Sequence, residues 1–158
     1  MRRLRLLCLV ALLATPAHAD RLKAGDWLFG FGLGYASAPG LFLASPHLER
    51  VIQGSWMLGM LAQAGFGAND ALFAISATGR FQIGDHPRLR PTLEAGLGFA
   101  TASRTYNATL GFEIHGGMGI EYLWDSGLAI GTMVRANFAP PLHDFFLTWA
   151  IANARFLF

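Results

Sequence analysis

The chain has 158 residues, of which 53% are hydrophobic and only 14% are charged, with 19 glycines and 13 phenylalanines. A soluble domain normally carries about 25% charged residues, so this composition argues against an ordinary water-soluble protein. The formal net charge of +2 does not indicate a nucleic-acid partner, because Arg2, Arg3 and Arg5 lie in a segment that we expect to be removed.

The N-terminal segment that we expect to be removed has the features of a secretion signal. A basic start is followed by an apolar stretch over residues 6–14, and residues 15–19 end in the small-x-small pattern that a signal peptidase cuts. The apolar stretch is too short for a membrane-anchoring helix, which needs about 20 residues. We therefore expect cleavage after Ala19, which leaves residues 20–158 as one mature domain.

Apolar residues recur at every second position over most of the mature chain, which is the pattern of strands with two different faces. The alternation runs through residues 27–36, 73–83, 89–99, 110–124 and 128–138. The second face carries glycine, alanine and a few charges. This suits a narrow lumen filled by side chains, with the apolar face turned to lipid. The alternative, a soluble β-sandwich, would carry more Lys, Glu and Thr on its outer face.

Turn signals divide the chain into eight segments, each long enough for a tilted strand to cross a bilayer. The signals fall at residues 39–40, 53–55, 68–70, 84–87, 103–108, 125–127 and 140–144. The segment over residues 41–52 fits no clean alternation and is either a strand or an outer loop. The prediction is an all-β fold, an eight-stranded antiparallel up-and-down transmembrane β-barrel.

Aromatic residues fall into two groups if the strands run alternately up and down from a periplasmic start. The group at the rim that carries both chain ends contains Trp27, Phe29, Trp56, Phe81, Tyr122 and Trp124. The group at the other rim contains Tyr35, Phe66, Phe73, Phe99, Phe138 and Phe146. Two such groups are typical of the aromatic girdles at the two interfaces of a membrane.

Charged residues on the second face are the candidate site, because they would point into the lumen. They are Arg80, Arg90, Glu94, Glu113, His115, Glu121, Arg135 and Arg155. If Thr101 faces Leu110, antiparallel pairing sets Arg90 opposite Glu121, and Glu94 becomes a diagonal neighbour of Arg80. Buried charges persist only when they are paired, so we expect a salt-bridge plug. A proton or ion gate made of the same residues is the alternative.

Three short segments carry a family resemblance. Residues 89–99 resemble the "RPY-GAG" strand of OmpW-like proteins, although Thr92 replaces the usual aromatic residue, and residues 117–122 resemble the "G-G-EY" strand before the last periplasmic turn. The ending, with Phe158 last and Phe156 two positions earlier, is similar to the signal that outer-membrane barrels present to their assembly machinery. The mature chain thus resembles small barrels of the OmpA-transmembrane, OmpX and OmpW type.

This resemblance implies an outer-membrane location with both chain ends periplasmic. The expected partners are outer-membrane lipid, lipopolysaccharide and the barrel-assembly machinery, with no nucleic acid; the oligomeric state stays open, with a monomer favoured. The expected function is a structural or surface-interaction role in the cell envelope, without enzymatic activity, cofactor or metal. The only cysteine, Cys8, falls in the signal segment, which excludes a cysteine-based metal site from the mature chain.

Two other functions stay open. The OmpW resemblance implies a passage for small hydrophobic molecules, with a lateral or luminal opening lined by residues such as Leu28, Met57, Leu61, Met133 and Trp149. Some barrels of this size modify lipid A, and a His, an acid and a Ser near the outer loops would be needed for that chemistry. The candidates are His143, Asp144, Ser37 and Ser103. No local motif joins the histidine to a serine, which makes this the remote alternative.

Overall fold

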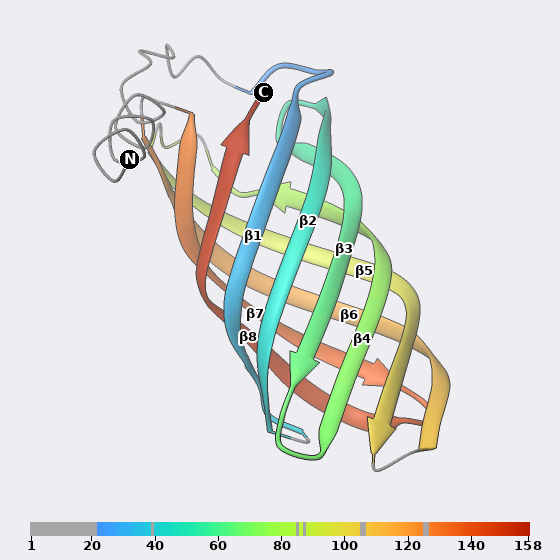
Figure 1. Ribbon diagram of the computed structural model, residues 1–158. Helices are drawn as coiled ribbons and strands as arrows, with labels where there is room; N and C mark the ends of the chain where they lie inside the picture. Colours follow the sequence, from blue (N-terminus) through green and yellow to red (C-terminus); the bar gives the residue numbers. More distant parts are fainter. Residues whose placement is uncertain (1–21, 39, 85, 87, 105–106, 125–126) are drawn as a thin grey trace, which may run out of the picture.

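The computed structural model describes residues 22–38, 40–84, 86, 88–104, 107–124 and 127–158. They form one closed barrel in which eight strands follow one another in chain order (Figure 1). The strands are β1 (Trp27–Ala36), β2 (Leu41–Gln53), β3 (Trp56–Phe66), β4 (Asp70–Gln82), β5 (Leu89–Arg104), β6 (Asn107–Leu123), β7 (Leu128–Ala139) and β8 (His143–Leu157). The predicted fold is confirmed. No helix in these ranges is long and apolar enough to cross a membrane.

Each strand pairs antiparallel with the next, and β1 closes the barrel against β8. The pairing of Leu28 with Leu157 places the start of β1 and the end of β8 at one end of the barrel, which we call the terminus end. The opposite end, where β1 turns into β2 and β7 turns into β8, is the loop end (Figure 1). The expected signal peptide, residues 1–19, lies outside the described residues.

Residues 41–52, for which the sequence left a strand and an outer loop open, belong to strand β2. Burial alternates regularly along it, but its inward side chains change from Leu41 and Leu43 near the loop end to Ser45, His47 and Glu49 further along. The alternation of hydropathy is therefore lost along β2, although its side chains still point alternately inward and outward. This change of chemistry along one face hid the strand in the sequence.

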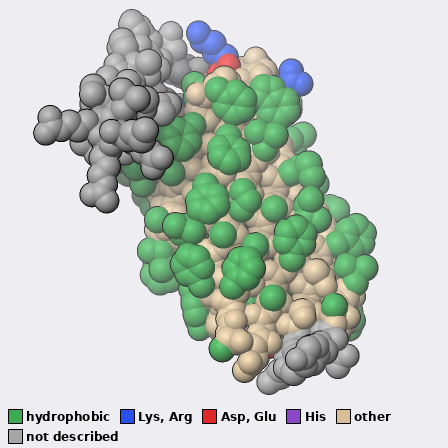
Figure 2. All heavy atoms as spheres, in the orientation of Figure 1, with side chains coloured by type: hydrophobic (Ala, Val, Ile, Leu, Met, Phe, Trp, Pro, Cys, Tyr) green, Lys and Arg blue, Asp and Glu red, His purple; other side chains and the backbone are tan. Residues whose placement is uncertain are grey.

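The face that Figure 2 shows is an apolar belt, and the charged side chains visible on it lie at the terminus end. Along β1, Phe29, Phe31 and Tyr35 point outward, and each of them is 40–49% exposed. Such a surface on a monomer in water would be a large aggregation-prone patch, whereas in lipid it is the expected surface. The inside-out distribution of polarity therefore favours a barrel that is surrounded by lipid.

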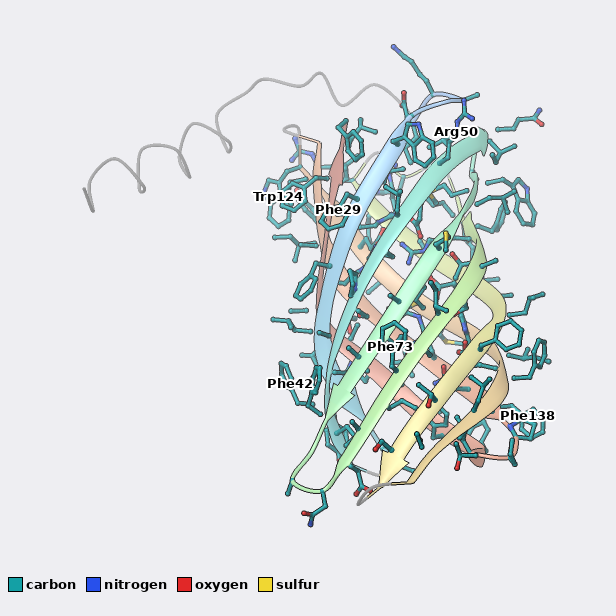
Figure 3. All side chains as sticks on the ribbon, turned by 45° about the vertical axis from the view of Figure 1, so that its right-hand side comes forward. Phe29, Phe42, Arg50, Phe73, Trp124 and Phe138 are labelled. Atoms are coloured by element: carbon teal, nitrogen blue, oxygen red, sulfur yellow. The ribbon has the colours of Figure 1, made fainter. Side chains whose placement is uncertain are left out.

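The predicted girdle residues point to this outer face, with one exception. Figure 3 shows Phe29 and Trp124 toward the terminus end and Phe42 and Phe138 toward the loop end. Phe146 was wrongly placed: it is 2% exposed and lies inside the barrel, while Phe145 is 62% exposed. Adjacent residues of a strand point to opposite faces, so only one of these two phenylalanines can face outward. A register shift between β7 and β8 near Ala139 precedes this point.

Candidate functional site in the barrel lumen

Arg80 on β4 lies at the centre of the buried polar interior and contacts carboxylates from three other strands. Its Nη2 is 2.6 Å from Oε2 of Glu94 on β5, and its Nε is 3.1 Å from Oε1 of Glu49 on β2. Its Nη1 is 3.4 Å from Oε1 of Glu121 on β6. A single guanidinium thus joins strands that are far apart around the barrel wall.

Two further arginines extend this arrangement. Arg155 on β8 places Nη1 2.7 Å from Oε2 of Glu49, and its Nη2 donates to Oε2 of Glu121. Arg135 on β7 places Nε 2.5 Å from Oε1 of Glu94. We call these six side chains the charge cluster: Arg80, Arg135, Arg155, Glu49, Glu94 and Glu121. All six are at most 5% exposed, so each charge depends on its partners rather than on bulk water.

His115 and Glu113 on β6 continue the polar interior toward the loop end. Nδ1 of His115 is 2.8 Å from Oε1 of Glu113, and its Nε2 is 3.4 Å from Oε1 of Glu94. The imidazole therefore stands between one carboxylate of the charge cluster and one outside it. Among the described residues, no group of His, Cys, Asp and Glu side chains has an arrangement that could hold a metal ion.

Glycines on neighbouring strands make room for these side chains. Gly96 pairs with His115, and Gly131 pairs with Glu121. A Cβ atom at position 96 would lie 2.5 Å from Nε2 of His115, and one at position 131 would lie 2.8 Å from Cγ of Glu121. Both distances are closer than atoms can pack. The glycine-rich face that the sequence displays is thus the surface against which long charged side chains lie.

The predicted register of β5 and β6 is confirmed, since Thr101 pairs with Leu110 and Arg90 with Glu121. The side chain of Arg90 nevertheless lies outside the charge cluster. It is only half-buried, near the terminus end, and donates from Nη1 to Oε1 of Gln82 at 3.3 Å, while Glu121 contacts Arg80 and Arg155. Strand pairing fixes which backbones are adjacent, but a long arginine can reach across the lumen to a third strand.

The position of Glu94 also differs from the expected one, because it pairs directly with Arg80 rather than diagonally. His47 and Glu49 were missed as lumen residues, because the segment over residues 41–52 shows no clean alternation of hydropathy. Both lie inside on β2, at 4% and 1% exposure. Both lie an even number of residues from Leu41, which was the available signal, and Pro46 interrupted the pattern.

Apolar side chains close the lumen on both sides of the charge cluster. We call the layer at the loop end the apolar lid: Ala36, Leu41, Leu72, Ala74, Ala100, Ala139 and Phe146. At the terminus end, a smaller group contains Leu28, Val51 and Met57, with Leu22 and Leu157 packed against it. Along the barrel axis, the charge cluster therefore has an apolar layer on each side.

The residues expected to line a hydrophobic passage do not form one surface. Leu61 and Met133 are buried inside the barrel, but Met57 lies within 3.5 Å of Nη1 of Arg155. Trp149 lies on the outer face, where it is 50% exposed, and its Nε1 donates to Oγ1 of Thr132 at 2.8 Å. At least one of the buried apolar residues thus packs against an arginine of the charge cluster.

The candidate residues for lipid A chemistry are only partly described. Oγ of Ser37 accepts a hydrogen bond from the backbone N–H of Leu147 at 3.0 Å, which gives this hydroxyl a structural partner. Ser103 is an exposed residue near the end of β5. The side chains of His143 and Asp144 lie outside the described part of the structure.

Comparisons with known proteins agree on the fold. No protein family model matches the sequence, and no curated protein matches it either. Among solved structures, the N-terminal β-barrel domain of Pseudomonas aeruginosa OprF is similar with a TM-score of 0.68 and 14% identity, covering 86% of this chain and 98% of that one. Neisserial surface protein A gives a TM-score of 0.65 and 14% identity over 86% and 98%.

The outer-membrane enzyme PagL is also similar, with a TM-score of 0.55 and 15% identity over 82% of this chain and 98% of that one. These neighbours are small outer-membrane barrels, and the chain shares their fold. At such low identity, the similarity does not extend to activity, since one fold carries many functions.

Proposed function

We propose that this protein is an integral outer-membrane β-barrel with a closed lumen and a structural role in the cell envelope. The observation that supports closure most strongly is the charge cluster, in which three arginines and three glutamates from six strands pair across the interior. The closed eight-stranded barrel and its outer-membrane structural neighbours support the location.

The physical basis of closure is that every arginine of the cluster is paired with at least one of its glutamates. A permeating ion would need to separate buried pairs, and removing one partner from such a pair costs about 3–5 kcal/mol. The apolar lid adds a second barrier, because it offers no polar group to replace the hydration shell of an ion. A barrel of eight strands is also only wide enough for its own side chains to fill.

The outer surface supports a fixed orientation in the membrane. Aromatic residues lie near both ends of the apolar belt, as in the girdles of outer-membrane barrels. We place both chain ends in the periplasm, and Phe156 and Phe158 at the end of the chain serve as the signal for the assembly machinery. Lipid and lipopolysaccharide are then the partners of the belt and of the loop end.

Enzymatic activity is not part of this proposal. PagL shows that an enzyme can have this fold, but the hydroxyl of Ser37 is already bonded to the backbone. Mass spectrometry of lipid A from cells with and without the gene checks this point. The loss of an acyl chain only in the presence of the protein would contradict it.

The proposal is tested by reconstituting the protein into liposomes and measuring swelling in an isotonic solution of a small sugar. Heat-dependent migration on a gel first establishes that the barrel is folded, and separation of the two membranes of the source cell by density establishes its location. We expect no swelling above empty liposomes, with a general porin as the positive control. Swelling by folded wild-type protein would overturn closure, and recovery in the inner membrane would overturn the location.

A further inference from the structure

Arg90, at the start of β5, is an arginine of the lumen that the charge cluster leaves outside. The cluster contains three arginines and three glutamates, so its formal charges cancel. Arg90 therefore adds a positive charge at the terminus end. Among the described residues, its guanidinium has no carboxylate partner and donates only to the side-chain oxygen of Gln82, at 3.3 Å. A half-buried cation of this kind favours a counter-ion.

The carboxylate that strand pairing sets opposite Arg90 is already occupied. Glu121 pairs with Arg90, but its Oε1 contacts Nη1 of Arg80 at 3.4 Å and accepts from Nδ2 of Asn153 at 3.2 Å. Its Oε2 accepts from Nη2 of Arg155. Both oxygens of Glu121 are thus used within the interior, and the described residues supply no counter-ion to Arg90.

Two buried polar side chains beside Arg90 also lack partners. Gln82 on β4 pairs directly with Thr92 on β5, and the two residues are 7% and 1% exposed. Because Arg90 can only donate, its bond fixes the oxygen of the Gln82 amide toward it, and Nε2 of Gln82 is left without an acceptor. Oγ1 of Thr92 has no partner among the described groups either. Native proteins leave few buried polar atoms open, so a ligand is expected here.

The chemistry of these open groups indicates an anion. The guanidinium of Arg90 and the amide nitrogen of Gln82 only donate, and the hydroxyl of Thr92 can donate as well. A cation would be repelled by Arg90, and a neutral ligand would leave its charge without a counter-ion. Guanidinium groups recognise phosphate through paired N–H donors. A tetrahedral phosphate also offers more acceptor oxygens to three separate donors than a planar carboxylate does.

The site is open toward the terminus end and bounded on its inner side. Arg90 is half-buried where β4 ends and β5 begins. Gln82 lies two residues beyond Arg80 on β4, and Thr92 lies two residues before Glu94 on β5, so the charge cluster borders the site toward the loop end. The smaller apolar group occupies the side of this mouth that β1, β2 and β3 form. An anion can thus bind at the mouth without crossing the lumen.

We propose that Arg90, Gln82 and Thr92 form a binding site for a phosphate group at the terminus end of the lumen. Arg90 supplies the positive charge, and the amide of Gln82 and the hydroxyl of Thr92 supply two further hydrogen bonds. The phosphate comes from solution as inorganic phosphate or from the headgroup of a phospholipid in the adjoining leaflet. Neither source requires an open lumen, so this site adds a ligand to a closed barrel.

Binding is measured on the folded, isotopically labelled barrel in a phosphate-free detergent, through the magnetic resonance signal of the Gln82 side-chain amide. Inorganic phosphate is added in one arm and short-chain phosphatidylglycerol in the other, at constant ionic strength. We expect a saturable shift. A shift in the first arm identifies free phosphate as sufficient, and a shift in the second arm alone identifies the lipid headgroup. No saturable shift in either arm would overturn the proposal. Gln63, which is 1% exposed on the loop side of the charge cluster, is the control that should not shift.

Variants then test the assignment of the residues. Arg90→Gln should weaken binding by about tenfold or more, because it removes charge-assisted hydrogen bonds. Thr92→Val removes a hydroxyl and no charge, so it should weaken binding less, and it keeps the test valid if the first variant does not fold. Arg50→Gln, an exposed arginine at the same end that stacks on Trp27, is the matched control with unchanged affinity. Wild-type affinity in both Arg90→Gln and Thr92→Val would overturn the assignment.

Thermal denaturation separates a ligand site from a purely structural arginine. A ligand that binds only the folded state stabilises it, so phosphate should raise the denaturation temperature of the wild type and of Arg50→Gln. It should not raise that of Arg90→Gln. An equal rise in all three proteins would indicate a general effect of the salt and would contradict the site.

Discussion

Glu94 is the carboxylate on which the charge cluster most depends, and its replacement by glutamine is the sharpest perturbation of the interior. Its two oxygens contact Arg80 at 2.6 Å, Arg135 at 2.5 Å and His115 at 3.4 Å. Glutamine keeps the shape but loses the negative charge, so Arg135 loses its carboxylate partner. Removal of one partner from a buried pair costs about 3–5 kcal/mol, and we expect a loss of that size in the free energy of unfolding.

The assay is reversible unfolding in urea from lipid vesicles, followed by tryptophan fluorescence and by gel migration of the folded barrel. The double variant Glu94→Gln, Arg135→Met should recover part of the loss, because it leaves no unpaired guanidinium at that position. Arg50→Ala is the exposed control, and it removes only a cation–π contact, 5.6 Å from the ring centroid of Trp27. A loss below about 1 kcal/mol in the single variant would refute the reasoning, because surface ion pairs are worth no more than that.

Three further changes test other parts of the structure by the same unfolding assay. Gly96→Ala should lower the free energy of unfolding by about 1–3 kcal/mol, because its Cβ would collide with a buried imidazole, whereas Gly116→Ala, with open space around it, should change little. Phe146→Ala should cost about 3–5 kcal/mol as a core truncation, and Phe145→Ala clearly less; equal losses would place both rings in one environment. Thr132→Val should lower stability by about 1 kcal/mol and shift tryptophan emission, since an indole N–H at the outer face loses its acceptor.

Most of the fold could be predicted because outward apolar residues and inward small or polar residues alternate along the strands of a barrel in lipid. The hydropathy of the sequence then repeats every two residues. β1 shows this clearly, since large outward rings alternate with glycine and alanine. The same reasoning failed at β2, where the inward face changes from leucine to histidine and glutamate within one strand. Periodicity of hydropathy detects a face only when that face keeps one chemistry along its length.

Most residues of the site could be named from the sequence, but the contacts between their side chains could not. Parity placed Arg80, Arg135 and Arg155 inside, and the contacts of Arg80 and Arg155 with Glu49 show why the pairing could not be predicted. Register arguments relate adjacent strands, whereas an arginine extends far enough to bind a carboxylate on a strand across the lumen. Phe146 was misplaced for a related reason, since residue type alone cannot decide which of two adjacent phenylalanines faces lipid.

The most direct test of a closed, charge-paired lumen is the conductance of single wild-type barrels in a planar bilayer. We predict no steady channels from folded wild-type protein. Steady channels should arise in the variant Glu49→Ala, Arg155→Ala, Phe146→Ala, which shortens side chains of both the charge cluster and the apolar lid. Steady wild-type channels as large as those of the triple variant would contradict the central claim that the interior is closed by its own paired charges and lid.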